Sequence, residues 1–154
     1  MVLSQRSQYA VRAVFELAKR YGAGTTTAAR IAEAQAIPVR FLENILGQLR
    51  QAGIVESVRG KEGGYSLRLA PRKVSVGEVV RLIQGPMSAI DCADPVGGGA
   101  GGGRDCPLRP GCVLLPMWEK AHRAMMDVFD ETTFGDLVEQ EKAAYECLAI
   151  DYAI

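Results

Sequence analysis

The hydrophobic positions in the first half of the chain change from a helical spacing to an alternating one. Apolar residues recur every three or four positions in three successive stretches, as expected for amphipathic helices. These stretches are residues 7–21, 28–36 and 38–51. From Ile54 to Leu69 apolar and polar residues alternate around a glycine-rich turn that carries two cations. The pattern predicts three helices followed by a β-hairpin.

The second half begins with a short helix and a long break in periodicity. Ser75 and Glu78 have the spacing of a capping box and open a helix that ends at Gln84. Residues 87–112 have no periodicity, and six of the seven residues 97–103 are glycine. Such a composition cannot pack a core and predicts a flexible loop. Helical spacing returns over residues 114–130, and a last helix is predicted after Thr132 and Thr133.

Composition and charge narrow the class of protein. The 154 residues, 48% apolar and 23% charged, fit one globular domain with an extension. The formal charge is zero, but residues 1–73 hold 12 Lys/Arg and 5 Asp/Glu, while residues 74–154 hold 6 and 13. A basic half is a candidate phosphate-binding surface. We expect no membrane partner and a cytoplasmic location, because no apolar run or signal-peptide core is present.

The order of elements in the basic half predicts a winged helix-turn-helix over residues 1–73, in a mainly α fold with a small β-hairpin. Its third helix would enter the major groove of double-stranded DNA, and its hairpin would reach the neighbouring backbone. The alternative is a small helical domain whose hairpin only closes the core. The candidate DNA-binding residues are Thr27, Pro38, Arg40, Phe41, Glu43, Asn44, Arg50, Arg59, Gly60 and Lys61.

The remaining chain divides into a sensor segment, residues 74–112, and a helical segment, residues 113–154. Helix-turn-helix proteins usually read palindromic sites as dimers, so the long helix is a candidate dimerisation helix. The alternative is that this helix packs only on its own domain. The candidate dimerisation residues are Met117, Trp118, Ala121, Ala124, Met125 and Val128.

Three cysteines, Cys92, Cys106 and Cys112, lie within or at the end of the glycine-rich segment, while Cys147 stands apart. A cytosolic chain does not ordinarily use disulfides for stability, so three clustered thiols indicate metal or redox chemistry. Thiolates suit zinc or an iron–sulfur cluster, but the paired spacing of a zinc site is absent. A metal centre, reactive thiols without metal, and incidental cysteines all stay open on these residues alone.

Several motifs together resemble one bacterial family. They are Tyr9-Ala10-Val11-Arg12-Ala13, Ile37-Pro38 with Phe41-Leu42-Glu43, Val58-Arg59-Gly60 with Gly63-Gly64-Tyr65, Ser75-Val76-Gly77-Glu78, and Cys92, Cys106 and Cys112 followed by Trp118. Over about residues 1–140 the chain is similar to the iron–sulfur winged-helix regulators typified by IscR and NsrR, with the cluster-free regulator CymR as a relative. The resemblance implies a homodimeric transcription factor. It also implies three cysteine ligands to a 2Fe–2S or 4Fe–4S cluster that controls DNA affinity.

The chain departs from the family pattern at the cluster. The gap between Cys92 and Cys106 is longer than usual in the family. IscR-like members place a histidine where this chain has Leu115, and NsrR-like members place an aspartate where it has Gln8. The fourth ligand is therefore unassigned, and Glu33 of the partner subunit is one candidate.

We therefore expect a sequence-specific transcriptional regulator controlled by an iron–sulfur cluster. One alternative is a cluster-free, thiol- or metabolite-responsive regulator of the same fold, in which Cys106 and Cys112 form a disulfide. A second is a protein-interaction or cluster-carrier module that does not bind DNA. An enzyme is not expected, because His122 is the only histidine and no phosphate-binding loop is present.

Overall fold

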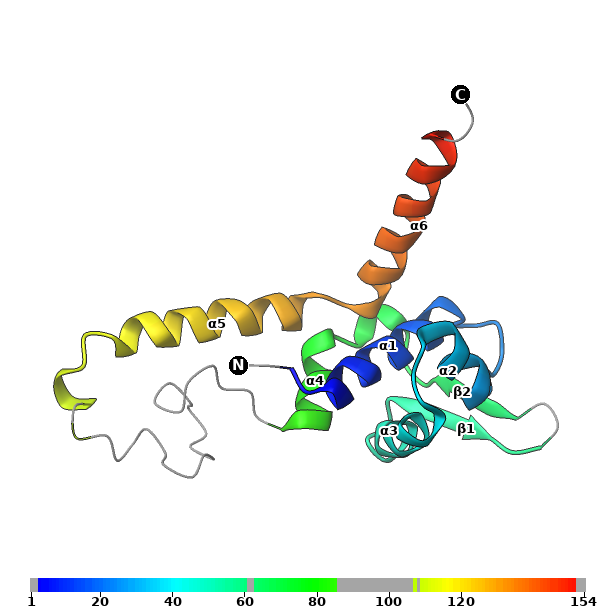
Figure 1. Ribbon diagram of the computed structural model, residues 1–154, viewed down its shortest axis with the longest axis horizontal. Helices are drawn as coiled ribbons and strands as arrows, with labels where there is room; N and C mark the ends of the chain where they lie inside the picture. The colour runs from blue at the N-terminus through cyan, green and yellow to red at the C-terminus, as the bar shows by residue number, and fades with distance from the viewer. Residues whose placement is uncertain (1–2, 61–62, 86–106, 108, 152–154) are drawn as a thin grey trace.

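The computed structural model describes residues 3–60, 63–85, 107 and 109–151, and these residues form helices and one hairpin (Figure 1). The helices are α1 (Gln5–Lys19), α2 (Ala28–Gln35), α3 (Val39–Gln51), α4 (Val76–Gln84), α5 (Leu115–Glu131) and α6 (Phe134–Asp151), with the short 3-10 turns η1 (Pro71–Lys73) and η4 (Arg109–Gly111). Strands β1 (Val55–Val58) and β2 (Gly64–Leu67) pair antiparallel, with Glu56 opposite Ser66. The predicted fold, mainly α with a small hairpin, is confirmed.

Hydroxyl side chains set where three of these helices begin. Ser4, Thr27 and Ser75 each accept a hydrogen bond from the backbone N–H three residues further on. The cap at Ser4 starts α1 earlier than hydrophobic spacing alone predicts. Gly53, just after α3, has φ +75° and forms a left-handed cap. Ala36, which ends α2, has φ +48°, a conformation that is unfavourable for a residue with a Cβ atom.

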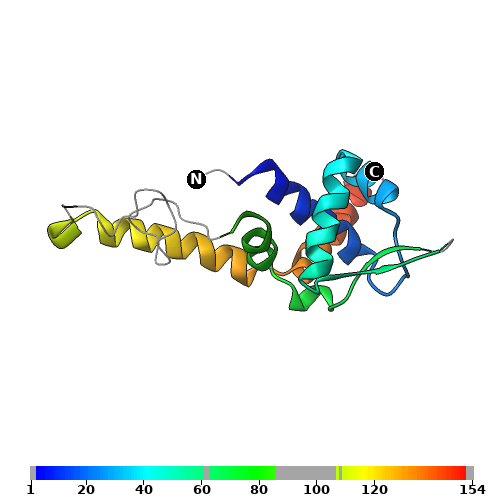
Figure 2. The ribbon, with the colours of Figure 1, turned by 90° about the horizontal axis from the view of Figure 1, so that it is seen from below.

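Helix α1 is the centre of the hydrophobic core. It packs against α2, α3, α4 and α6, and the two views in Figures 1 and 2 show it running through the middle of the domain. Its inner face meets an apolar row on α3. These buried residues are Ala10, Ala13, Val14 and Leu17 of α1 and Leu42, Ile45, Leu46 and Leu49 of α3. Phe134, the first residue of α6, is fully buried in the same core.

The hairpin is fixed beside the helix-turn-helix by the segment that precedes α2. Thr26 and Tyr65 exchange two backbone hydrogen bonds, each 2.8 Å long. A Cβ atom on Gly64 would lie 2.7 Å from the Thr26 carbonyl, so a side chain at this position would separate the hairpin from the domain. The hairpin therefore projects from the domain at a fixed angle, as a wing.

Helix α5 leaves the domain, and none of its residues is buried (Figure 1). Its C-terminal end is anchored, because Arg81 of α4 forms an ion pair with Asp130 at 2.7 Å. The turn into α6 is held by a hydrogen bond from the Val76 amide to the Thr132 carbonyl at 2.9 Å. The described helices include none that is long and apolar enough to cross a membrane.

Candidate nucleic-acid interface

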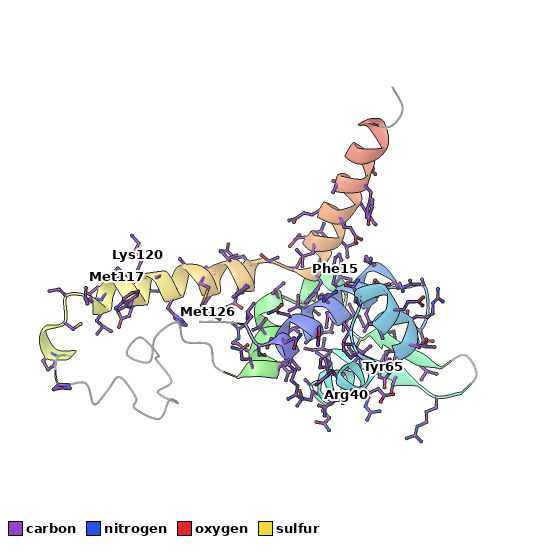
Figure 3. The ribbon with its side chains drawn as sticks, viewed as in Figure 1. Phe15, Arg40, Tyr65, Met117, Lys120 and Met126 are labelled. Atoms are coloured by element: carbon purple, nitrogen blue, oxygen red, sulfur yellow. The ribbon has the colours of Figure 1, made fainter. Side chains whose placement is uncertain are left out.

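The N-terminal half of α3 presents polar and aromatic side chains on one exposed face. Arg40, Glu43 and Asn44 are exposed, while their neighbours Leu42 and Ile45 are fully buried. Figure 1 shows α3 on the side of the domain opposite to α6, and Figure 3 shows Arg40 on its outer side. This face is therefore exposed, and its entry into a groove of duplex DNA stays a prediction.

An aromatic and cationic cluster stands at the start of this face. The Arg40 guanidinium lies 4.8 Å from the ring centroid of Phe41, which packs at 6.4 Å against the Tyr9 ring. The Phe41 side chain is nevertheless 45% exposed. A guanidinium stacked on an aromatic ring is held in a defined orientation, and the exposed ring edge can contact a thymine methyl group.

Arg6 of α1 belongs to the same surface, although the sequence did not single it out. It donates a hydrogen bond to Asn44, and these two residues line a hollow of about 380 Å³ with Arg40 and Phe41. The only sequence signal was a cation in the exposed first turn of α1. Its partner lies 38 positions away, beyond the reach of any local pattern.

Two other candidate residues, Arg50 and Thr27, form hydrogen bonds within the domain and lie outside the cluster of Arg40, Phe41 and Tyr9. Arg50, at the far end of α3, donates a hydrogen bond to Ser57 at 3.3 Å and joins α3 to β1. Thr27 caps α2 by accepting a hydrogen bond from the Arg30 amide at 3.3 Å. Thr27 is exposed, so it stands where the N-terminus of α2 can meet a phosphate.

The wing presents Arg59 and Gly60, which are both exposed. Gly60 has φ +114°, a conformation that favours glycine, and its carbonyl accepts a hydrogen bond from the Gly63 amide at 2.9 Å. The chain therefore turns sharply just after Arg59. Lys61, the second predicted cation of the tip, lies outside the described residues.

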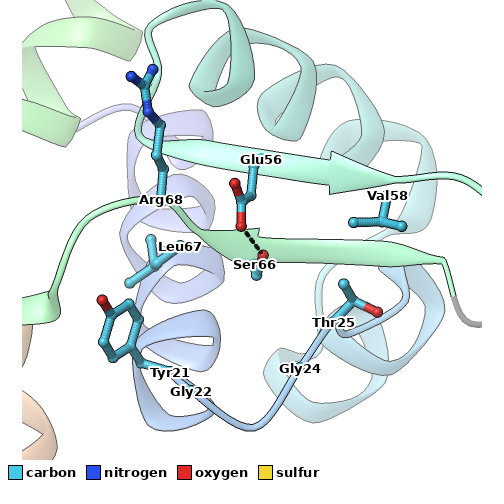
Figure 4. A pocket seen from close by; sticks show the side chains of 9 residues that line it. All are labelled: Tyr21, Gly22, Gly24, Thr25, Glu56, Val58, Ser66, Leu67 and Arg68. Carbon is cyan, nitrogen blue, oxygen red and sulfur yellow. Dashed lines mark hydrogen bonds between the residues drawn. The ribbon is translucent and has the colours of Figure 1, made fainter.

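A second hollow, of about 440 Å³, separates the hairpin from the loop between α1 and α2 (Figure 4). Within it Ser66 donates a hydrogen bond to Glu56 at 3.0 Å, and these residues are directly opposite each other on the two strands. Cross-strand pairs of this kind stabilise the register of a hairpin. The pair thus supports the register of β1 and β2.

The predicted dimerisation residues fall on two different faces of α5. Five apolar residues with alternating spacings of three and four are exposed; we call them the α5 stripe. They are Leu114, just before the helix, Met117, Ala121, Ala124 and Val128. Trp118 and Met125 are half-buried beside this stripe. In Figure 3, Met117 and Lys120 lie on the upper side of α5 and Met126 on the lower side, nearer α4.

Of the three predicted cysteine ligands, only Cys112 lies within the described residues. It is a half-buried free thiol between η4 and α5, while Cys92 and Cys106 lie outside the described residues. The described part of the chain contains no cluster of three His, Cys, Asp or Glu side chains that could hold a metal. The Nδ1 atom of His122, on α5, is buried and has no hydrogen-bond partner among these residues. Glu33 is exposed on α2.

Comparisons with known proteins agree with this geometry. The chain matches the Rrf2 family model, described as an iron-dependent transcriptional regulator, over residues 3–140. It is 30% identical over 148 residues to the HTH-type transcriptional regulator CymR of Bacillus subtilis, covering 94% of this chain and 97% of that protein. The solved structure of T. potens IscR has a TM-score of 0.73 and 30% identity, covering 94% of this chain and 90% of that one.

A second solved structure, the oxidized form of Staphylococcus aureus CymR, has a TM-score of 0.69 and 31% identity, covering 90% of this chain and 97% of that one. The relatives whose names state a role are transcriptional regulators and not enzymes. This favours the DNA-binding interpretation over a protein-interaction or cluster-carrier module. By its family match, its helix-turn-helix and its wing, the chain belongs to the Rrf2 family of transcriptional regulators.

Proposed function

We propose that two copies of this chain pair through α5 and bind a palindromic promoter site, and that an iron–sulfur cluster controls the affinity. The observation that carries the proposal is the α5 stripe, an exposed apolar row on a helix that projects from a DNA-binding domain. Exposed apolar rows of this kind usually mark a protein interface. Their spacing of three and four residues is that of a helix-pair seam.

The residues of the stripe favour an antiparallel pair with its two-fold axis near the middle of α5. Met117 of one copy would then face Val128 of the other, and Ala121 would face Ala124. The small alanine side chains permit close approach of the helices at the centre. Such a pair is symmetric, so it would carry the two reading helices to the two halves of a palindrome.

Charges beside the stripe support the same arrangement. Lys120 and Asp127 are both exposed and follow the stripe on one flank. In an antiparallel pair Lys120 of one copy approaches Asp127 of the other. In a parallel pair, residues of the same number lie at the same level and this attraction is lost. The flanking charges therefore favour antiparallel pairing.

The cluster would be held by Cys92, Cys106 and Cys112. Thiolates are the usual ligands of iron–sulfur clusters, and the half-buried free thiol of Cys112 suits that role. The cysteine segment connects α4 to α5, which the ion pair between Arg81 and Asp130 already joins. A bound cluster would supply a redox-sensitive link between these helices. It would control DNA binding only by favouring one arrangement of the dimer over another.

The direct test is purification of the full chain without oxygen, followed by iron and sulfide analysis and visible spectroscopy. We expect a coloured protein whose iron and sulfide are lost when Cys112 is replaced by serine. The control is Cys147→Ser, which should keep both. A colourless protein without iron after reconstitution would exclude the cluster while leaving DNA binding to be measured separately.

A second candidate is a thiol switch without metal, in which Cys106 and Cys112 form a disulfide. It is favoured by the likeness to CymR of Staphylococcus aureus, which has been solved in an oxidized form. Peroxide would take two electrons and two protons from the thiols and leave as water. Thiol counting on metal-free protein, before and after peroxide, should show a loss of two thiols that Cys112→Ser abolishes, and the anaerobic iron and sulfide analysis then distinguishes this switch from a cluster.

A further inference from the structure

Arg6, in the first turn of α1, reaches across to Asn44 on the exposed face of α3. Its Nη2 atom lies 2.6 Å from Asn44 Oδ1. A guanidinium carries only N–H donors, so the atom that faces it has to be the amide oxygen and not the amide nitrogen. The contact therefore fixes which end of the Asn44 amide turns away from α1.

Both ends of this contact rest on well-anchored backbone. The start of α1 is held by Gln84 of α4, whose side-chain oxygen accepts a hydrogen bond from the Ser4 amide at 2.9 Å. Asn44 is followed on α3 by Ile45, which is fully buried in the core. The two side chains thus meet from two packed helices. The backbone at both ends is therefore fixed, and only the two side chains lose freedom when they bond.

The contact leaves both N–H groups of the Asn44 amide available and engages one lone pair of its oxygen, so the oxygen can accept from a base only through its second lone pair, beside the Arg6 guanidinium. Nδ2 of Asn44 has no hydrogen-bond partner among the described residues, and the side chain borders the hollow shared with Arg40 and Phe41. An asparagine with both ends available reads adenine, because it accepts from N6 and donates to N7. With its oxygen bonded to Arg6, Asn44 can offer two N–H donors to a base more readily than it can offer one acceptor together with one donor.

We infer that Arg6 is a positioning residue for DNA reading, which turns Asn44 into a donor that selects a base with acceptors on its major-groove edge. The inference rests on the proposed use of α3 as the reading helix. Guanine presents two such acceptors, O6 and N7, while adenine presents one acceptor and one donor. Asn44 therefore prefers guanine at the base it contacts. Loss of Arg6 frees the oxygen and moves the preference toward adenine.

The test is selection from a library of randomised duplexes by the full-length chain, with sequencing of the bound fraction. Wild type should enrich a palindrome. Arg6→Ala should change the guanine-to-adenine ratio by about tenfold at one position in each half-site and leave the other positions alone. Asn44→Ala should lose the preference at that position. Adding Arg6→Ala to Asn44→Ala should then leave the base preference unchanged.

The matched control is Arg30→Ala, which removes another exposed arginine, on α2. It should leave the guanine-to-adenine ratio of wild type intact, and thermal unfolding should show that every variant folds. An Arg6→Ala protein that loses affinity evenly across all sequences, with a flatter salt dependence, would show a plain phosphate contact and overturn the inference. A wild type that enriches no sequence would overturn the proposed function, and this inference with it.

Discussion

Gln84 and Ser7 join the last turn of α4 to the first turn of α1. The side-chain oxygen of Gln84 accepts a hydrogen bond from the Ser7 hydroxyl at 3.0 Å, and Ser7 is fully buried. The same oxygen accepts from the Ser4 amide, so one acceptor serves two groups at the start of α1. Gln84 therefore connects the helix that leads into the cysteine segment with the helix that carries Arg6.

Replacing Gln84 by alanine should lower the free energy of unfolding by about 1 kcal/mol, because a buried hydroxyl loses an acceptor. Gln84→Glu should keep most of this stability, since a carboxylate also accepts both bonds and its charge is favourable at a helix N-terminus. Urea denaturation of both variants measures the difference. If the glutamate variant loses as much stability as the alanine variant, Gln84 does not act as an acceptor.

A charge placed in the α5 stripe should prevent pairing. Ala124→Glu would bury a carboxylate in the proposed seam and should raise the dimer dissociation constant by roughly 100-fold or more. Analytical ultracentrifugation over a range of concentrations measures this constant. The matched control is Ala34→Glu, on an exposed position of α2, which should leave pairing unchanged. Equal effects of the two variants would argue against α5 as the seam.

The wing should contribute to the salt dependence of DNA binding. Arg59→Ala should weaken binding and reduce the slope of log affinity against log salt by about one, because one phosphate contact is lost. Gel shifts over a salt series measure the slope. Arg72→Ala is the control, since Arg72 is on η1, paired with Asp136 of α6 at 3.3 Å, and should leave the slope unchanged. An unchanged slope for Arg59→Ala would exclude the wing contact.

The buried carboxylate of Glu16 should make folding sensitive to acid. Glu16 is 2% exposed, and its oxygens bind Arg20 at 2.8 Å and Gln35 at 3.0 Å. Burial raises the pKa of Glu16, but hydrogen bonds from Arg20, Gln35 and Lys19 together lower this pKa below its ordinary value. A lowered folded-state pKa stabilises the protein above the unfolded-state pKa, about 4.3, and this contribution is lost as the pH falls through the folded-state value.

Glu16→Gln should therefore cost roughly 2 kcal/mol at pH 7 and much less at pH 3. Urea midpoints of wild type and variant, measured from pH 7 to pH 3, should approach each other on the acid side. A constant difference between the two proteins over this range would mean that the charge of Glu16 makes no contribution to stability.

The sequence predicts structure best where the physical cause is local. The helices around Leu42 and Val79 follow from apolar spacing, and the left-handed cap at Gly53 follows from the conformational freedom of glycine. On α5, hydrophobic spacing does not distinguish the exposed face of the helix from its half-buried face. Both Met117 and Trp118 are apolar and adjacent, so spacing alone could not tell the exposed stripe from the half-buried side.

The clustering of basic residues, the hydrophobic periods and the family motifs were enough to predict a winged helix-turn-helix regulator, because each depends on residues close together in the chain. The match to the Rrf2 family model confirms this prediction. Only the folded chain decided that Arg6 faces Asn44, 38 positions away, and that Ser7 meets Gln84, 77 positions away. Contacts over such separations depend on how α1 packs between α3 and α4. That packing is a property of the whole core, and no local pattern encodes it.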